Sequence, residues 1–144
     1  MSCVLRAKGV NFAVDEFLAG SPLKPMAIFR RGELPRYGDS QPDGPKPSFS
    51  GFNLSASDAD FSEVQLQIAN AIHFLEQNQA ELARLVAFPG VESVYLDFGI
   101  EERNVAAQTE CFPPKLLSIL GKLGVWLEFT LYPGHEPESD NLVP

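Results

Sequence analysis

A long amphipathic segment at residues 61–87 constrains the fold more than any other part of the chain. Apolar side chains recur there with the period of an α-helix. They are Val64, Ile68, Ala71, Ile72, Leu75, Leu82, Leu85 and Val86. Polar residues such as Gln67 fall on the opposite face, and Asp60 and Glu63 match a capping box at the start. The segment predicts one helix whose apolar stripe lies on a sheet and whose polar face lies in water.

Five other segments have the composition or the alternation of strands. They are residues 2–8, 26–31, 49–57, 91–100 and 125–132. Two shorter helices are predicted at 11–19 and at the proline-led segment 113–124, and a weaker alternation predicts a further strand at 105–111.

This order of elements predicts a single α+β domain over residues 1–133. The first six elements follow the ferredoxin-like βαββαβ pattern, and a helix and a strand extend it at the C-terminal side. We expect a mainly antiparallel sheet with the helices on one face. The other face would be partly open and would carry Tyr95, Asp97, Trp126, Glu128, Thr130 and Tyr132.

Two segments lack regular structure in this prediction. Residues 32–48 contain four prolines and three glycines, which exclude a helix or a strand. A connection of this length is either functional or merely flexible, and the sequence leaves both possibilities open. Residues 134–144 form an acidic tail that we expect to be disordered.

The charge balance argues against two classes of partner. The chain has 19 acidic and 11 basic residues, for a net charge of −8. Nucleic-acid binding needs a basic face, and an anionic membrane surface attracts basic proteins, so we expect neither. No apolar run approaches the roughly 20 residues of a membrane span, and no signal peptide is visible at the N-terminus. Cys3 and Cys111 have no metal-binding spacing, and we expect both to be small buried apolar residues in a reducing compartment, which predicts a cytoplasmic protein.

No constellation of catalytic residues is recognisable. The two histidines, His73 and His135, have no paired-ligand spacing, and no phosphate-binding or nucleophile motif occurs. We therefore expect no metal and no cofactor, and we assign no catalytic residue. Asp97 and Glu101 cluster near the end of one strand, where two carboxylates in a cleft would suit acid–base work. A polar strand face that runs into a charged turn is the commoner explanation of such residues.

The strand at 26–31 ends in a second candidate site. Arg30, Arg31 and Glu33 are followed by Arg36 and Tyr37, at the entrance to the long loop. Arginine forks suit carboxylate recognition, and an adjacent aromatic residue can anchor a partner. Alternatively, these arginines only solubilise a strand end and pair with Glu33.

Several of these segments resemble a family of small bacterial proteins, domain of unknown function 4279. The similar segments are the basic-Gly-acidic step at 30–33, the aromatic and glycine strand at 49–54, the helix ending in Leu-Ala-Arg-Leu at 82–85, the proline-led leucine helix at 112–117, the Leu-Gly stop at 120–124 and the closing strand at 127–132. One difference is Phe29, where the family has tryptophan. The resemblance covers most of residues 2–133 and implies no catalytic activity. Some relatives are suspected immunity proteins, which block a toxin by binding it.

Three functional hypotheses follow. The first is a non-catalytic, protein-binding domain; in its immunity-type form, the partner would be a toxin. The second is an enzyme or small-ligand binder that uses Arg30, Arg31, Asp97 and Glu101 around one cleft. The third is a homodimer formed through the aromatic face of the sheet, which includes Trp126.

Overall fold

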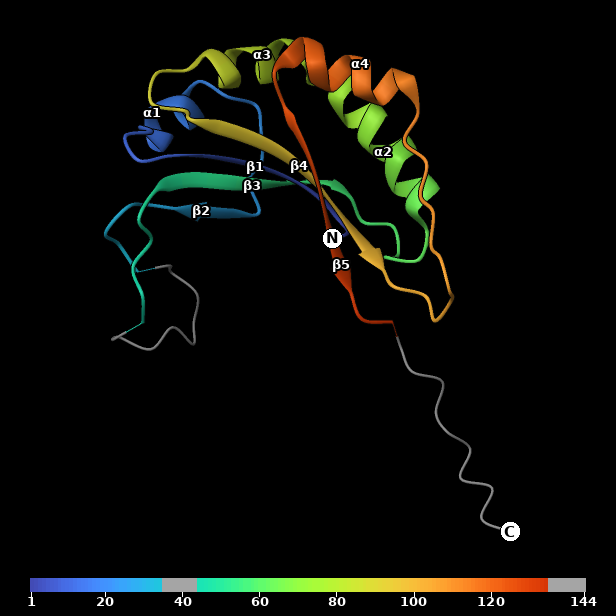
Figure 1. Ribbon diagram of the computed structural model, residues 1–144. Coiled ribbons are helices and arrows are strands. Elements are labelled where there is room, and N and C mark those ends of the chain that lie inside the picture. Colours follow the sequence, from blue (N-terminus) through green and yellow to red (C-terminus); the bar gives the residue numbers. More distant parts are fainter. Residues whose placement is uncertain (35–43, 135–144) are drawn as a thin grey trace.

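In the computed structural model, which describes residues 1–34 and 44–134, helices cover one face of a five-stranded sheet and leave its other face open (Figure 1). The elements in chain order are β1 (Cys3–Gly9), α1 (Val14–Ala19), β2 (Ala27–Phe29), β3 (Ser50–Ser57), α2 (Val64–Gln77), α3 (Gln79–Ala87), β4 (Ser93–Glu101), α4 (Pro114–Leu123) and β5 (Trp126–Tyr132). The predicted α+β class, with a mostly antiparallel sheet, is confirmed.

The strands lie in the order β2-β3-β1-β4-β5. β1 pairs antiparallel with β3 and with β4, β2 pairs antiparallel with β3, and β5 pairs parallel with β4. The five-strand order differs from that of a four-stranded ferredoxin-like sheet because β5 joins the edge of β4. α4 makes this parallel connection possible, since parallel neighbours need a crossover between them.

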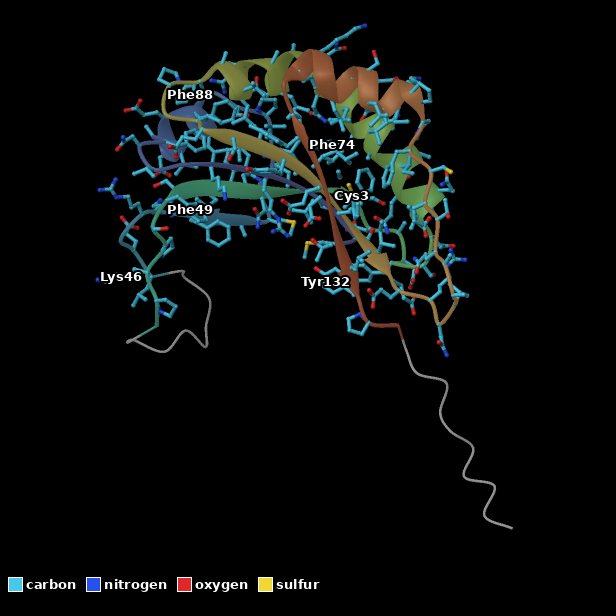
Figure 2. The ribbon with its side chains drawn as sticks, viewed as in Figure 1. Cys3, Lys46, Phe49, Phe74, Phe88 and Tyr132 are labelled. Atoms are coloured by element: carbon cyan, nitrogen blue, oxygen red, sulfur yellow. The ribbon has the colours of Figure 1, made fainter. Side chains whose placement is uncertain are left out.

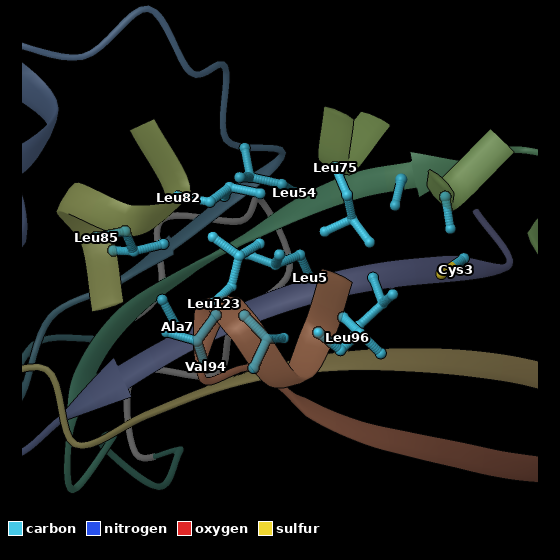
Figure 3. Close-up of a cluster of buried hydrophobic side chains, with 14 of the residues drawn as sticks. Cys3, Leu5, Ala7, Leu54, Leu75, Leu82, Leu85, Val94, Leu96 and Leu123 are labelled. Carbon is cyan, nitrogen blue, oxygen red and sulfur yellow. The ribbon is translucent and has the colours of Figure 1, made fainter. Parts of the chain in front are cut away.

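The core lies between the sheet and the helices (Figure 3). The central strands β1 and β4 send alternate side chains into it, and Leu5, Leu96 and Phe98 have no exposed surface. Leu75 and Leu82, from the helices above them, are equally inaccessible. Each such side chain contributes roughly 1.5–3 kcal/mol relative to leaving it in water, so this layer provides most of the stabilisation of the fold.

A group of phenylalanines docks the short helix α1 against the sheet. Phe17 of α1 stacks on Phe52 of β3 with the ring centroids 5.8 Å apart, and Phe88 meets Phe17 edge-on at 5.2 Å. The guanidinium of Arg84 lies 4.0 Å from the Phe17 ring centroid and donates a 2.9 Å hydrogen bond to the Phe17 carbonyl. Arg84 also bonds Glu81, and this partner holds the pKa of the Glu81 carboxyl below its usual range.

The single helix predicted at 61–87 is wrong in one respect, because Asn78 divides it into α2 and α3. The Asn78 side chain donates a 2.8 Å hydrogen bond to the Phe74 carbonyl and offers the backbone an alternative to the helical ladder. The predicted capping box is also wrong, since the Asp60 carboxylate accepts from the N–H of Ser62 instead.

Gln67, which the sequence places on the polar face of this helix, is completely buried. Its amide donates to the carbonyl oxygens of Gly99 at 2.8 Å and of Asp60 at 3.2 Å. The side chain therefore ties the start of α2 to the end of β4. Periodicity alone missed this role, because a buried amide has the same sequence signature as a solvated one.

The strand predicted at 105–111 is not formed, and this segment is irregular. Gln108 accepts from the Arg103 N–H at 2.9 Å and donates to the Glu101 carbonyl at 3.0 Å. These local side-chain bonds satisfy backbone groups that a strand ladder would otherwise use. The segment runs from β4 to Pro114, the first residue of α4, and Gly124 ends that helix with a positive φ of 78°, as the sequence predicts.

Candidate functional site

The arginines predicted as a binding cluster are held at the edge of the sheet beside α1. The Arg30 guanidinium donates two hydrogen bonds, of 2.7 and 3.0 Å, to the Asp15 carboxylate of α1. This pairing lowers the pKa of the Asp15 carboxyl. Arg31 donates from its guanidinium to the Val10 carbonyl at 3.4 Å. Glu33 closes a turn with its backbone N–H on the Arg30 carbonyl. The expected Arg–Glu33 pairing is thus replaced by the ion pair with Asp15.

Two members of that predicted cluster, Arg36 and Tyr37, lie outside the described residues, as do 35–43 of the long loop and the tail from residue 135. The hypothesis that either one contacts a partner stays a prediction.

Arg30 and Asp97 do not share a cleft. Arg30 follows Phe29, which is level with Ser93 of β4 across the paired strands. Asp97 lies three strands away and four residues farther along β4, a separation of roughly 15–20 Å from standard strand spacings. The geometry therefore gives no support to an active site that combines the arginines with the carboxylates of β4.

Asp97 is instead the centre of a polar cluster on the open face. It is only 4 % exposed, although no helix of the described chain covers this side of the sheet. Its carboxylate lies 3.2 Å from the Arg6 guanidinium and accepts from the Thr130 hydroxyl at 2.9 Å. Three neighbouring strands each provide one member, so the cluster is fixed by the sheet register.

An aromatic row crosses the same face beside this cluster. The ammonium of Lys8 lies 5.2 Å from the Phe49 ring centroid and 5.5 Å from that of Tyr95, within cation–π distance of both. Tyr95 in turn lies 6.0 Å from Trp126 of β5. Trp126 is 63 % exposed, so the row ends in a large apolar side chain that faces water. The register of β4 and β5 places Trp126 beside the cluster around Asp97.

Phe61 and Tyr132 form a third contact on this face, at the far end of β4. Their rings lie 5.0 Å apart, and Phe61 covers Gly99, where a Cβ atom would meet the ring at 2.5 Å. Figure 2 shows Tyr132 and Phe49 toward opposite ends of the sheet and Phe74 and Phe88 on its helix side. We use "open face" for the surface made by Arg6, Lys8, Phe49, Phe61, Tyr95, Asp97, Trp126, Thr130 and Tyr132.

A pocket of about 600 Å³ lies on the helix side of β5. Phe112, Phe129 and Leu131 provide its apolar wall, and Arg103 and Glu110 stand at its rim, 3.7 Å apart. The irregular segment after β4 forms one side of it. None of the residues proposed from the sequence as binding residues lines this pocket.

The two cysteines differ from one another. Cys3 is buried, and burial together with the negative charge of Asp97 raises the pKa of its thiol, so it remains protonated at neutral pH. Cys111 is exposed, which corrects the prediction that both are buried. Within residues 1–34 and 44–134, no three His, Cys, Asp or Glu side chains group in a way that could hold a metal ion.

The sequence identified Asp97 and Trp126 but missed Arg6, which pairs with Asp97, and Lys8, which lies over the Tyr95 ring. It also missed Asp15, the partner of Arg30. Arg6 and Lys8 were visible as the polar side of an alternating strand, yet only the pairing of β1 with β4 brings them to Asp97 and Tyr95. Pairing between distant segments is not encoded in local periodicity.

Comparison of the chain with protein-family models, with curated proteins and with solved structures gave no match. In the described part of the chain, none of the helices has the length and hydropathy of a membrane-spanning helix. The resemblance to domain of unknown function 4279 stays a prediction.

Proposed function

We propose that this chain is a non-catalytic protein-binding domain whose contact surface is the open face. The observation that carries the proposal is the exposed Trp126 beside the fixed cluster of Arg6, Asp97 and Thr130. Tryptophan, tyrosine and arginine are the residues that dominate binding energy in protein interfaces. Here they stand on paired strands rather than on loops, so little conformational entropy is lost when a partner binds.

The charge of the chain favours a basic partner. A net charge of −8 accelerates association with a positively charged surface and weakens association with an acidic one. Many toxins that act on nucleic acid are basic, because they bind phosphates. An immunity role, in which the domain blocks such a toxin, is the specific form of the proposal and rests on this complementarity and on the family resemblance.

Three further proposals accompany this one. The chain is a bacterial cytoplasmic protein of the kind that it resembles. Its partner is a protein rather than a nucleic acid. Its first four strands belong to the ferredoxin-like class, for which their antiparallel pairing in the order β2-β3-β1-β4 is the supporting observation.

Site-specific photo-crosslinking tests the proposed surface. A photo-reactive phenylalanine analogue replaces Tyr95 on the open face or, as the control, Leu117, which is 47 % exposed on α4. We expect one basic protein to be captured in host cells from position 95 and not from position 117, and we expect Trp126→Ala to abolish the capture. Equal capture from both positions, or capture that survives Trp126→Ala, would refute the proposed surface.

A further inference from the structure

We propose that two copies of this chain associate edge to edge through β5, antiparallel, about a two-fold axis at Phe129. β5 is the last strand of the sheet, and no described residue pairs with its outer side. It is seven residues long, whereas β2 at the opposite edge has three. Short edges are one way in which proteins avoid unwanted pairing, and a long edge without lysine or proline is a template for another strand. This inference is argued from the β5 backbone and does not require the partner proposed above, but Trp126 and Tyr132 belong to both surfaces.

The backbone of β5 shows which groups are available to a partner. The Tyr132 carbonyl accepts from the Glu102 N–H at 2.8 Å, so Tyr132 directs its peptide groups toward β4. Successive residues of a strand direct these groups to opposite sides. Leu127, Phe129 and Leu131 therefore offer their N–H and C=O groups to the outer edge.

Because only alternate residues of β5 offer their peptide groups to the outer edge, few antiparallel registers are possible. An axis at Phe129 pairs Phe129 with its own copy and Leu127 with Leu131 of the other copy, so all three outward residues form hydrogen-bonded pairs. An axis at Glu128 would place two carboxylates directly opposite one another, which is unfavourable. An axis at Thr130 would bring Leu127 opposite Pro133, which has no N–H to donate.

The sequence of β5 fits the favoured register, because Trp-Leu-Glu-Phe-Thr-Leu-Tyr reads almost the same in both directions by residue type. Around Phe129, Trp126 faces Tyr132 of the second copy and Leu127 faces Leu131. Glu128 faces Thr130, so no like charges are opposed. Cross-strand aromatic and aliphatic pairs of this kind each add about 0.2–1 kcal/mol.

The exposed apolar area agrees with a stable dimer. Trp126, Phe129, Leu131 and Tyr132 are 63, 55, 52 and 42 % exposed. At about 150–250 Å² for a large side chain, they present on the order of 400 Å² per chain. A standard interface buries about 800 Å² per partner, of which about 57 % is apolar. These four side chains lie two on each face of β5, and an edge contact would cover part of this apolar area.

Molar mass measured by light scattering across a dilution series tests the association. We expect the mass to rise from one chain to two with concentration. Leu131→Pro should keep the protein monomeric, because it removes an outward N–H and leaves the bonds to β4 intact. Leu66→Asp on the exposed side of α2 is the matched control and should still dimerise. Added salt should strengthen the dimer by screening two chains of charge −8. A constant monomer mass up to several hundred micromolar would overturn the inference.

Disulfide trapping tests the register without relying on the proline variant. In a Cys111→Ser background, single cysteines replace residues 127 to 131 one at a time. With the axis at Phe129, the two Cα atoms of residue 129 lie about 5.5 Å apart, within the range for a disulfide. Copies of residue 128 or 130 are diagonal neighbours at about 7–8 Å. We expect Phe129→Cys to form the covalent dimer fastest. A maximum at Glu128→Cys or Thr130→Cys, or equally slow trapping at all five positions, would contradict the inference.

Discussion

The two faces of the sheet are built from the same strands but are stabilised differently. On the helix side, Leu96 and Phe98 of β4 are fully buried among apolar neighbours. On the open face, Tyr95 and Asp97 of the same strand are held by named pairs with Lys8, Trp126, Arg6 and Thr130. The difference teaches that burial of apolar side chains, on the helix side, and pairing of polar and aromatic side chains, on the open face, are separable in this sheet. We expect the first to determine stability and the second to determine binding.

Truncation of Phe98 should produce the largest change in stability. Phe98→Ala deletes a ring with no exposed surface, and such changes cost about 3–5 kcal/mol of unfolding free energy. Chemical denaturation measures the loss. The matched variant on the opposite face of β4, Tyr95→Ala, should cost less than half as much, and equal costs would show that the two faces do not differ as we describe.

Removal of the Asp97 carboxylate should have an intermediate effect. Asp97→Ala loses the hydrogen bond from the Thr130 hydroxyl and the ion pair with Arg6, and should destabilise by about 1–3 kcal/mol. Arg6 is 46 % exposed in its side chain, so the solvent compensates the arginine once its partner is gone. A double-mutant cycle with Arg6→Ala measures the coupling, and a coupling energy of zero would remove the cluster from the description of the open face.

Trp126→Ala should separate stability from binding. Its side chain is 63 % exposed, so we expect its loss to change the unfolding free energy by at most about 0.5 kcal/mol. Capture of the partner should nevertheless fall to background. The result that would break the comparison is a large loss of stability together with unchanged capture.

A similarly small effect on stability is expected for the Arg30–Asp15 pair at the edge of the sheet. The pKa of Asp15 is lowered in the folded chain, so its contribution is present at neutral pH and is lost as the pH falls below about 4. The Asp15 side chain is 67 % exposed and that of Arg30 33 %, and solvent around the pair limits the stabilisation to about 1 kcal/mol or less. The thermal midpoint of Asp15→Asn should lie slightly below that of the wild type at pH 7 and converge with it at pH 3. A difference that grows on acidification would contradict this assignment.

Local periodicity was enough to predict the α+β class, the five strands and the apolar members of β4 and β5. It failed where a side chain competes for backbone hydrogen bonds, as Asn78 does within the predicted long helix and Gln108 does in the predicted strand after β4. It also failed for contacts between distant segments. Asp97 and Trp126 were identified individually, but their partners depend on strand order, which no local pattern contains.

Fluorine NMR of Trp126, which is the only tryptophan in the chain, gives the most direct test of the open face as the binding surface. Protein labelled with fluorotryptophan has one resonance, and the unlabelled partner recovered by crosslinking adds none. We expect this resonance to shift or broaden on titration and to saturate at one partner per chain. A resonance that stays unchanged while the partner binds would show that the contact lies elsewhere.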